Sequence, residues 1–219
     1  MLTPKNNDLI KIDYSISNGY FQKKIEYKND YKWNIADERL SYFADQSGED
    51  KIIPQIKWKR LGNIYFIQQK IIKKNFNKPN YAHFKKLSED LDTLNLNYFP
   101  HGDINKKNII FSNDKYRLID IEPVLNLSNL NKIFYFRSTI PYVHPDDEKN
   151  NFITIKSDLI GFIYFILKNF KYKQSYIKSK HKLILKNIEE FIKVDKPFFS
   201  ALIYCKKIFP TYQEGNLNG

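Results

Sequence analysis

Two short stretches in the middle of the chain combine acidic and amide side chains at close spacing. Residues 101–108 read HGDINKKN, and residues 118–123 read LIDIEP. Asp103 can accept a proton from a hydroxyl group, while Asn108 and Asp120 can offer oxygen ligands to a hard cation. Oxygen ligands suit magnesium, which usually binds together with substrate phosphates. The two stretches therefore indicate a magnesium-dependent reaction of a phosphate compound.

These stretches resemble the catalytic loop and the metal-binding strand of the protein-kinase-like superfamily. In that family a His, an Asp and an Asn at fixed spacing are followed by a second Asp. The resemblance implies that Asp103 is the catalytic base, and that Asn108 and Asp120 hold Mg²⁺ beside ATP. It also implies that His101 is the structural histidine of the loop.

Two further stretches are similar to protein kinases. Residues 138–147 resemble the end of an activation segment, with the family's residues in order: Thr139, Tyr142, Pro145 and Asp146. Residues 156–162 resemble the start of the buried central helix, which implies that Asp158 anchors the backbone of the catalytic loop. Because small-molecule kinases of the aminoglycoside type generally lack the Thr-to-Pro segment, these stretches favour a protein substrate.

The first part of the chain predicts a small sheet that carries one helix. Residues 9–27 alternate with period two around Ser17-Asn18-Gly19, which indicates a hairpin. Residues 33–44 have the apolar spacing of an amphipathic helix. Two more short strands are expected around 52–58 and 63–69.

The remainder of the chain predicts mostly helices. They are expected at 80–96, 156–170, 175–193 and 198–208, with strand-like segments at 109–111 and 116–121. Together with the resemblance, this order implies an α+β, two-lobed protein-kinase-like fold. Residues 1–70 form a reduced, β-rich N-lobe, and residues 71–219 form a mainly α-helical C-lobe with the catalytic loop and the activation-type segment.

The N-lobe departs from the family in its glycines. Apart from Gly215 and Gly219, no two glycines lie within ten residues of each other, which excludes a GxGxxG loop. We expect the loop that covers the phosphates to be missing or replaced by the tip Ser17-Asn18-Gly19. A partner that completes the lobe is a further expectation.

Lys23 is the candidate for contact with the nucleotide phosphates. The resemblance places such a lysine on the third strand of the fold. Lys23 shares one strand face with Phe21, Ile25 and Tyr27 and should point inward, whereas Lys24 should face solvent.

Other parts of the expected nucleotide site are less regular. The acidic partner of Lys23 is left open between Glu38, which lies almost opposite the apolar stripe of its helix, and Asp37, which lies nearer its flank. Gln68 and Gln69 lie where the hinge between the lobes is expected, so adenine should meet the backbone there. Asn105 stands where protein kinases carry a lysine.

These features favour an ATP- and Mg²⁺-dependent kinase that transfers the γ-phosphoryl group to a Ser or Thr hydroxyl of a protein. One alternative is a small-molecule phosphotransferase, because Gly102 and Glu122 resemble the branch that contains aminoglycoside phosphotransferases and choline kinases. A second alternative is a pseudokinase that acts as a binding module, suggested by the missing glycine loop and by Asn105.

Composition adds limits on partners and location. The formal charge of +12 favours an anionic partner, although the abundance of Lys, Asn and Ile also fits an AT-rich genome. The lysine runs are expected to be solvated faces, and nucleic-acid binding through them is an alternative that is not favoured. A single cysteine, Cys205, excludes an internal disulfide and a cysteine-based zinc site. The most apolar stretch, 159–167, is too short to span a bilayer, so a cytoplasmic protein without a membrane partner is expected.

Overall fold

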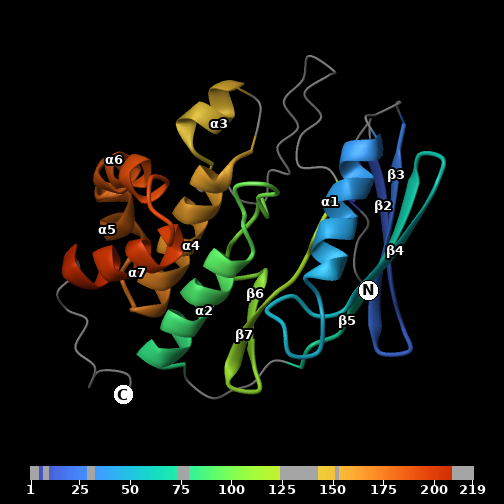
Figure 1. Ribbon diagram of the computed structural model, residues 1–219, viewed down its shortest axis with the longest axis horizontal. Helices are drawn as coiled ribbons and strands as arrows, with labels where there is room; N and C mark the ends of the chain where they lie inside the picture. Colours follow the sequence, from blue (N-terminus) through green and yellow to red (C-terminus); the bar gives the residue numbers. More distant parts are fainter. Residues whose placement is uncertain are drawn as a thin grey trace. The chain divides into compact units, whose positions relative to one another are not determined.

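The computed structural model describes residues 5–6, 10–28, 33–73, 79–123, 143–150 and 153–208. Its helices and strands, labelled in Figure 1, confirm the predicted α+β class, whereas the two-lobed kinase-like layout stays a prediction. The chain divides into two compact units. Unit 1 comprises Met1–Lys74 and Arg117–Val124, and unit 2 comprises Asn75–Tyr116 and Leu125–Gly219.

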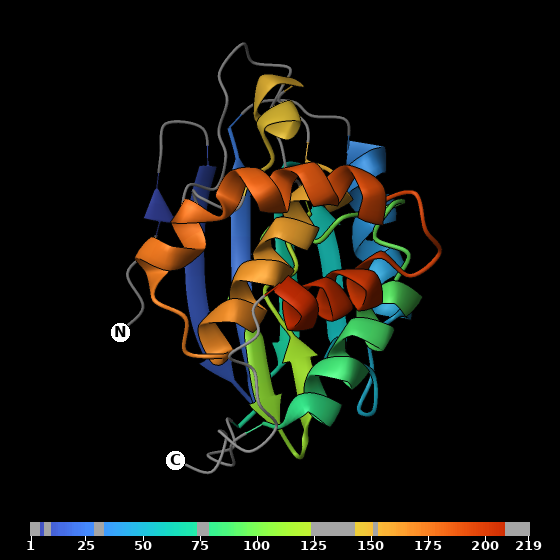
Figure 2. The ribbon, with the colours of Figure 1, turned by 90° about the vertical axis from the view of Figure 1, so that its left-hand side faces the viewer.

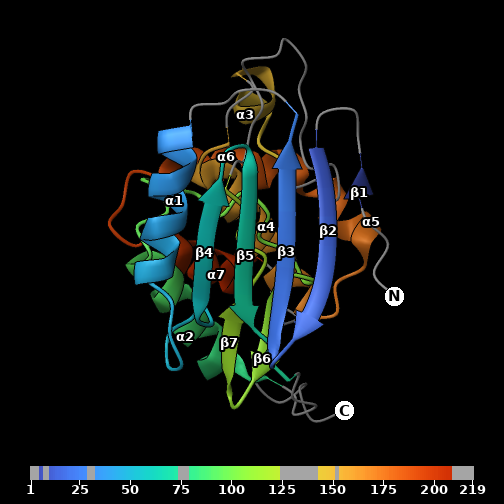
Figure 3. The same cartoon turned by 90° about the vertical axis from the view of Figure 1, so that its right-hand side faces the viewer.

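Unit 1 contains a five-stranded antiparallel sheet with the strand order β1-β2-β3-β5-β4 (Figure 3). Its strands are β1 Lys5–Asn6, β2 Ile10–Ser17, β3 Tyr20–Tyr27, β4 Ile56–Leu61 and β5 Ile64–Lys70. The predicted hairpin is confirmed, because Ser17 pairs with Tyr20 across the turn. Strand β4 begins later than predicted. Pro54 has no N–H for a ladder, so regular pairing starts only at Ile56.

Helix α1, Trp33–Asp45, confirms the predicted helix and packs beside β4 (Figure 3). Its apolar stripe buries Leu40 and Phe43. At its start, the Trp33 ring lies 5.6 Å from the ring of Tyr27 and 5.9 Å from that of Tyr65. The apolar side chains of the strands, which alternate with period two, therefore pack in one core with the apolar stripe of α1, as the sequence pattern predicts.

Unit 2 is mainly helical. Its elements are α2 Tyr81–Thr93, β6 Ile109–Ser112, β7 Lys115–Leu118, α3 Pro145–Asn150, α4 Ile155–Asn169, α5 Gln174–Ser179, α6 His181–Phe191 and α7 Pro197–Ile208, with the last two residues of β7 assigned to unit 1. Helix α7 packs against both α2 and α4 (Figure 2). Helix α4 is buried along almost its whole length, which accounts for its nearly unbroken apolar sequence. The described residues contain no helix that could span a bilayer.

The single helix predicted for 175–193 is wrong, because α5 and α6 are separate. Lys180 ends the first and precedes the second with φ −95° and ψ 0°. The Ser179 hydroxyl donates to the Tyr176 carbonyl, which satisfies an acceptor that a continuing helix would use. Apolar periodicity alone cannot show such a break, since Ile177 and Ile184 are both fully buried on either side of it.

Gly161 allows the backbone of the HGDINKKN loop to lie directly on α4. A Cβ atom at this position would meet the carbonyl oxygen of Ile104 at 2.1 Å, a distance that no side chain can adopt. The loop and the central helix of unit 2 are therefore packed backbone to backbone.

The first prediction tests this close approach. We expect Gly161→Ala to lower the free energy of unfolding by roughly 1–3 kcal/mol, because a backbone oxygen must move to make room. Urea unfolding followed by circular dichroism measures the change. Gly48→Ala is the matched control, since its Cβ would meet only the flexible Lys51 side chain at 3.3 Å. Equal losses in the two variants would contradict the expectation.

Candidate functional site

The backbone of the HGDINKKN loop is hydrogen-bonded to a buried carboxylate of α4. Asp158 is fully buried, and its Oδ2 accepts the backbone N–H of His101 at 2.6 Å while Oδ1 accepts that of Gly102 at 2.8 Å. This confirms the prediction that Asp158 anchors the loop. Asp158 does not cap the helix, since the N-cap of α4 is Thr154. Gly102 has φ +85°, a left-handed conformation that favours glycine at this point of the loop.

Two buried amides hold the carboxylate of Asp103. Asn105 Nδ2 donates to Oδ1 at 2.9 Å, and Asn108 Nδ2 donates to Oδ2 at 2.8 Å. Both amides also donate to the Asp103 carbonyl oxygen. Each oxygen of the Asp103 carboxylate therefore has an amide donor, which restricts the rotation of this side chain. Because Asn108 donates through Nδ2, its amide oxygen is left for another contact.

Asn105 is a positioning residue that sequence reasoning missed. The sequence indicated only that a lysine was absent there. The signal that could have revealed its role was its place two residues after an aspartate, where Asx side chains commonly bond to nearby backbone. The neighbouring lysines at 106 and 107 are exposed.

Lys23 lies between two carboxylates of the LIDIEP stretch, and all three residues belong to unit 1. Its Nζ is 2.6 Å from Asp120 Oδ1 and 2.6 Å from Glu122 Oε1. The Lys23 side chain is only 4% exposed, so its predicted inward direction is confirmed. Burial by itself would lower the pKa of Lys23, but Glu122 and Asp120 outweigh it and raise the pKa above the usual value.

The path of the LIDIEP stretch is set by contacts with other parts of unit 1. The Leu118 N–H donates to the Ile52 carbonyl at 2.8 Å, and the Asp120 N–H donates to Gln69 Oε1 at 3.1 Å. From α1, Arg39 Nε donates to the Glu122 carbonyl at 2.8 Å. Held in this way, Asp120 adopts φ +69°.

Neither acidic residue proposed from α1 is placed as a partner of Lys23. Asp37 accepts three hydrogen bonds from Arg60 and one from the Tyr65 hydroxyl, at 2.7–3.1 Å. Glu38 is exposed. Glu122 takes the place that the helix acid was expected to fill, and sequence reasoning missed this role although it had singled Glu122 out.

Gln68 and Gln69 lie in β5 on opposite faces of the strand. Gln69 is buried, and its Nε2 has no hydrogen-bond partner within the described part of the chain. A buried amide donor without a partner is rare and points to a group that binds there. The predicted contact of both glutamines with a nucleotide stays a prediction.

The donor set fits magnesium in its chemistry. Asn108 offers an amide oxygen, and Asp120 offers a carboxylate that already binds the ammonium of Lys23. Asp103 and Asn108 lie in unit 2, whereas Lys23 and Asp120 lie in unit 1. That Asn108 and Asp120 share one Mg²⁺ therefore stays a prediction of the resemblance.

The activation-type segment is described only at its end, since Thr139 and Tyr142 lie outside the described residues. Asp146, the acid predicted from the family order, is exposed. The neighbouring Asp147 is buried and accepts hydrogen bonds from the Thr154 N–H and hydroxyl and from the Ser157 hydroxyl, at 2.6–2.9 Å. Asp147 is therefore the buried acid that links α3 to the start of α4.

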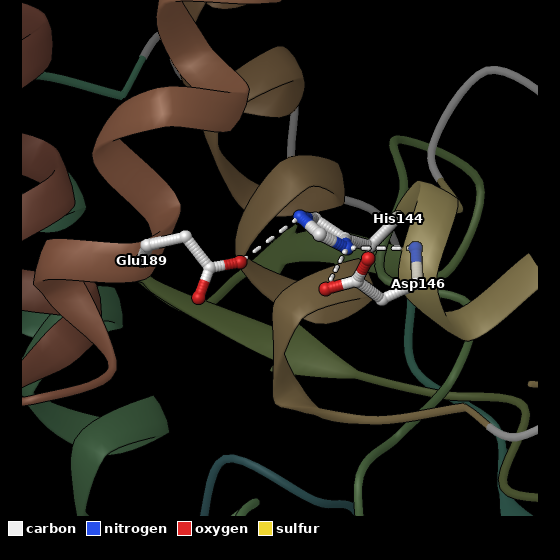
Figure 4. Close-up of side chains that lie close together, drawn as sticks. All are labelled: His144, Asp146 and Glu189. Atoms are coloured by element: carbon white, nitrogen blue, oxygen red, sulfur yellow. Dashed lines mark hydrogen bonds and ion pairs between the residues drawn. The ribbon is translucent and has the colours of Figure 1, made fainter.

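His144, Asp146 and Glu189 form the cluster shown in Figure 4, whose residue types could bind a metal. Asp146 Oδ2 faces His144 Nδ1 at 3.7 Å, whereas Glu189 Oε1 faces Nε2 at 3.5 Å. Nδ1 also accepts the Asp146 N–H at 3.2 Å. The two carboxylates thus lie at different ring nitrogens, and Lys156 Nζ bridges them at 2.8 and 2.7 Å. This geometry is that of an ion-pair network.

No protein-family model matches the sequence. No curated protein matches it either. Among solved structures, the chain is similar to the pseudokinase domain of BIR2, described as an immune regulator of the RLK/Pelle family. The two are 11% identical, the match covers 93% of this chain and 80% of that one, and the TM-score is 0.49.

The second prediction concerns Asp158. We expect Asp158→Asn to lower the free energy of unfolding by about 2 kcal/mol, because the amide can accept only one of the two backbone N–H groups. Urea unfolding measures the loss. Asp146→Asn, which weakens the contacts of an exposed carboxylate with Lys156 and His144, should cost less than about 1 kcal/mol. A smaller loss in Asp158→Asn than in this control would refute the anchor.

The third prediction concerns pH. Burial and the charge of Lys156 lower the pKa of His144 below its usual value, despite opposing effects of Asp146, Asp147 and Glu189. Below about pH 6.5 the unfolded chain therefore binds a proton that the folded chain resists, and stability falls as the pH drops through the folded-state pKa.

Thermal melts between about pH 7 and pH 5 measure this effect. We expect His144→Gln to lose less melting temperature on acidification than the wild type. Burial and the charge of His144 also lower the pKa of His181, so His181→Gln and the double variant are measured beside His144→Gln to divide the slope between the two imidazoles. An unchanged slope in His144→Gln would show that this imidazole does not carry the effect.

Proposed function

We propose that this chain is an ATP- and Mg²⁺-dependent phosphotransferase of the protein-kinase-like superfamily that acts on Ser or Thr hydroxyls of proteins. The observation that carries the proposal is the fixed carboxylate of Asp103. It is held by Asn105 and Asn108, on a loop whose backbone is bound to the buried Asp158. A general base must be held within hydrogen-bond reach of the proton that it accepts, and such a loop provides this.

The proposed reaction needs one proton acceptor and no covalent intermediate. Asp103 orients the acceptor hydroxyl and accepts its proton as the hydroxyl oxygen forms a bond to the γ-phosphorus of ATP. The bond between that phosphorus and the bridging oxygen breaks, and ADP leaves with the electron pair. The two amides keep the carboxylate in one orientation throughout.

Residues of unit 1 supply the nucleotide contacts in this proposal. Lys23 brings a buried positive charge for the phosphates, and the unpartnered Nε2 of Gln69 offers a donor to the nucleotide. Asp120 and Asn108 would hold Mg²⁺, which would neutralise charge on the phosphates when bound.

A protein acceptor is favoured by residues 138–147, which resemble an activation segment. A small-molecule acceptor is the second candidate, favoured by Gly102 and Glu122, whereas Asn105 favours the alternative of a pseudokinase. Asn105 stands where protein kinases carry a lysine. It binds the Asp103 carboxylate and brings no positive charge to the transferred group.

The fourth prediction tests the base. With ATP and Mg²⁺, we expect transfer to acceptor proteins and, by intact mass, to the chain itself. Asp103→Asn should lower the rate roughly 10²–10⁴-fold, the range that general-base catalysis contributes. Asp114→Asn is the matched control. It changes an exposed turn residue with φ +56°, which asparagine also adopts, so the rate should not change.

The outcomes separate the candidates. Transfer by Asp103→Asn at the wild-type rate would exclude the mechanism. Transfer to sugars, choline or aminoglycosides but not to proteins would assign the second candidate. If the wild type transfers nothing, and neither it nor Asp103→Asn gains thermal stability with ATP and Mg²⁺, the chain is a binding module.

A further inference from the structure

Lys23 is held by the stretch that carries the proposed metal ligand, and not by helix α1. We infer that Glu122 is the positioning residue of Lys23, and that it keeps the ammonium in place when Asp120 turns to the metal. This inference rests on the proposed function for its consequence, but the Lys23–Glu122 contact itself can be tested without any reaction.

The two carboxylates around Lys23 differ in burial. The Glu122 side chain is 14% exposed, whereas that of Asp120 is 37% exposed, and both lie 2.6 Å from Nζ. An ion pair shielded from water is stronger than one that water reaches, so Glu122 is the stronger partner. A buried ammonium also needs an acid that stays with it, because an unpaired buried charge is costly. If Asp120 binds a metal, Glu122 is the acid that stays.

Helix α1 contributes a cation to this arrangement. Arg39 is 3% exposed, and its guanidinium lies 4.7 Å from the centre of the Phe43 ring on the same helix. From there its Nε donates to the main-chain oxygen of Glu122. Helix α1 thus fixes the backbone of the residue whose side chain fixes Lys23. A displacement of α1 would reach Lys23 through Glu122.

The acids of α1 have other surroundings. Asp37 is bound by Arg60 and Tyr65, and Glu38 and Asp45 are exposed. Glu38 is therefore a matched control for Glu122. Both are glutamates of unit 1, both can be changed to glutamine, and only one lies at Lys23.

The fifth prediction is tested on the full chain without nucleotide or metal. Trace acetic anhydride acylates free amines, and peptide mass spectrometry gives the rate at Lys23 relative to Lys24, whose side chain is 37% exposed. In the wild type we expect Lys23 to react at least about tenfold more slowly than Lys24, because both carboxylates bind its amine. Glu122→Gln should raise the Lys23 rate about fivefold to tenfold, whereas Asp120→Asn and Glu38→Gln should change it less than about twofold.

A larger effect of Glu38→Gln or of Asp120→Asn than of Glu122→Gln would overturn the inference. So would a wild-type Lys23 that reacts as fast as Lys24, and this measurement needs no variant to fold. Glu122→Asp, which keeps the charge on a shorter side chain, should restore part of the protection. No restoration would mean that the shape of residue 122, and not its charge, protects Lys23.

Activity then separates this inference from the proposed function. If the chain transfers phosphate, Glu122→Gln should lower kcat and raise KM for ATP, and Glu122→Asp should recover part of both. Protection that depends on Glu122 in a chain without any transfer supports the Lys23–Glu122 contact and refutes the function. Transfer that is lost in Asp103→Asn but unchanged in Glu122→Gln supports the function and overturns the positioning role.

Discussion

The position of the HGDINKKN loop in unit 2 depends on the buried carboxylate of Asp158, a residue of α4. This carboxylate accepts two backbone N–H groups of a loop that has little regular structure of its own. A buried carboxylate must find donors, and a loop must find acceptors for its N–H groups, so each satisfies the other. Gly161, one turn further along α4, lets the same loop lie against the helix at Ile104. The orientation of Asp103 follows from this double attachment, because its amide holders Asn105 and Asn108 belong to the attached loop.

Much of this arrangement could be predicted from local patterns. Period two placed Lys23 on the buried face of its strand, and the resemblance of residues 156–162 to the central helix of protein kinases implied that Asp158 anchors the loop. The acid that binds Lys23 could not be predicted in the same way. Asp37 lies on α1, the helix that was expected to supply the acid, but the register of β4 places Arg60 beside it. Glu122 lies two residues after Asp120, and only contacts from the distant Ile52, Gln69 and Arg39 decide which way that stretch faces. Pairings of this kind are set by tertiary structure and leave no periodic signal.

Three of the basic side chains behind the net charge of +12 have structural roles. Lys23, Arg39 and Arg117 are buried and all serve the segment that contains Asp120. Lys23 binds its carboxylates, Arg39 binds its main chain, and Arg117 donates to the carbonyl groups of Lys51 and Glu49. Arg39 and Arg117 are thus both occupied inside unit 1 with main-chain oxygens. The acids Asp147 and Asp158 are buried as well, so the surface keeps a positive net charge close to the formal value.

The backbone of Asp120 has a consequence for how this chain can change. At φ +69° an aspartate is strained by about 1 kcal/mol relative to glycine, which adopts that conformation freely. Mutation to glycine would relieve the strain, and the N–H that Gln69 accepts would remain. Glycine would, however, also remove one of the two carboxylates that bind the buried Lys23. At position 120 the backbone conformation therefore favours glycine, whereas the ion pair with Lys23 favours the acid.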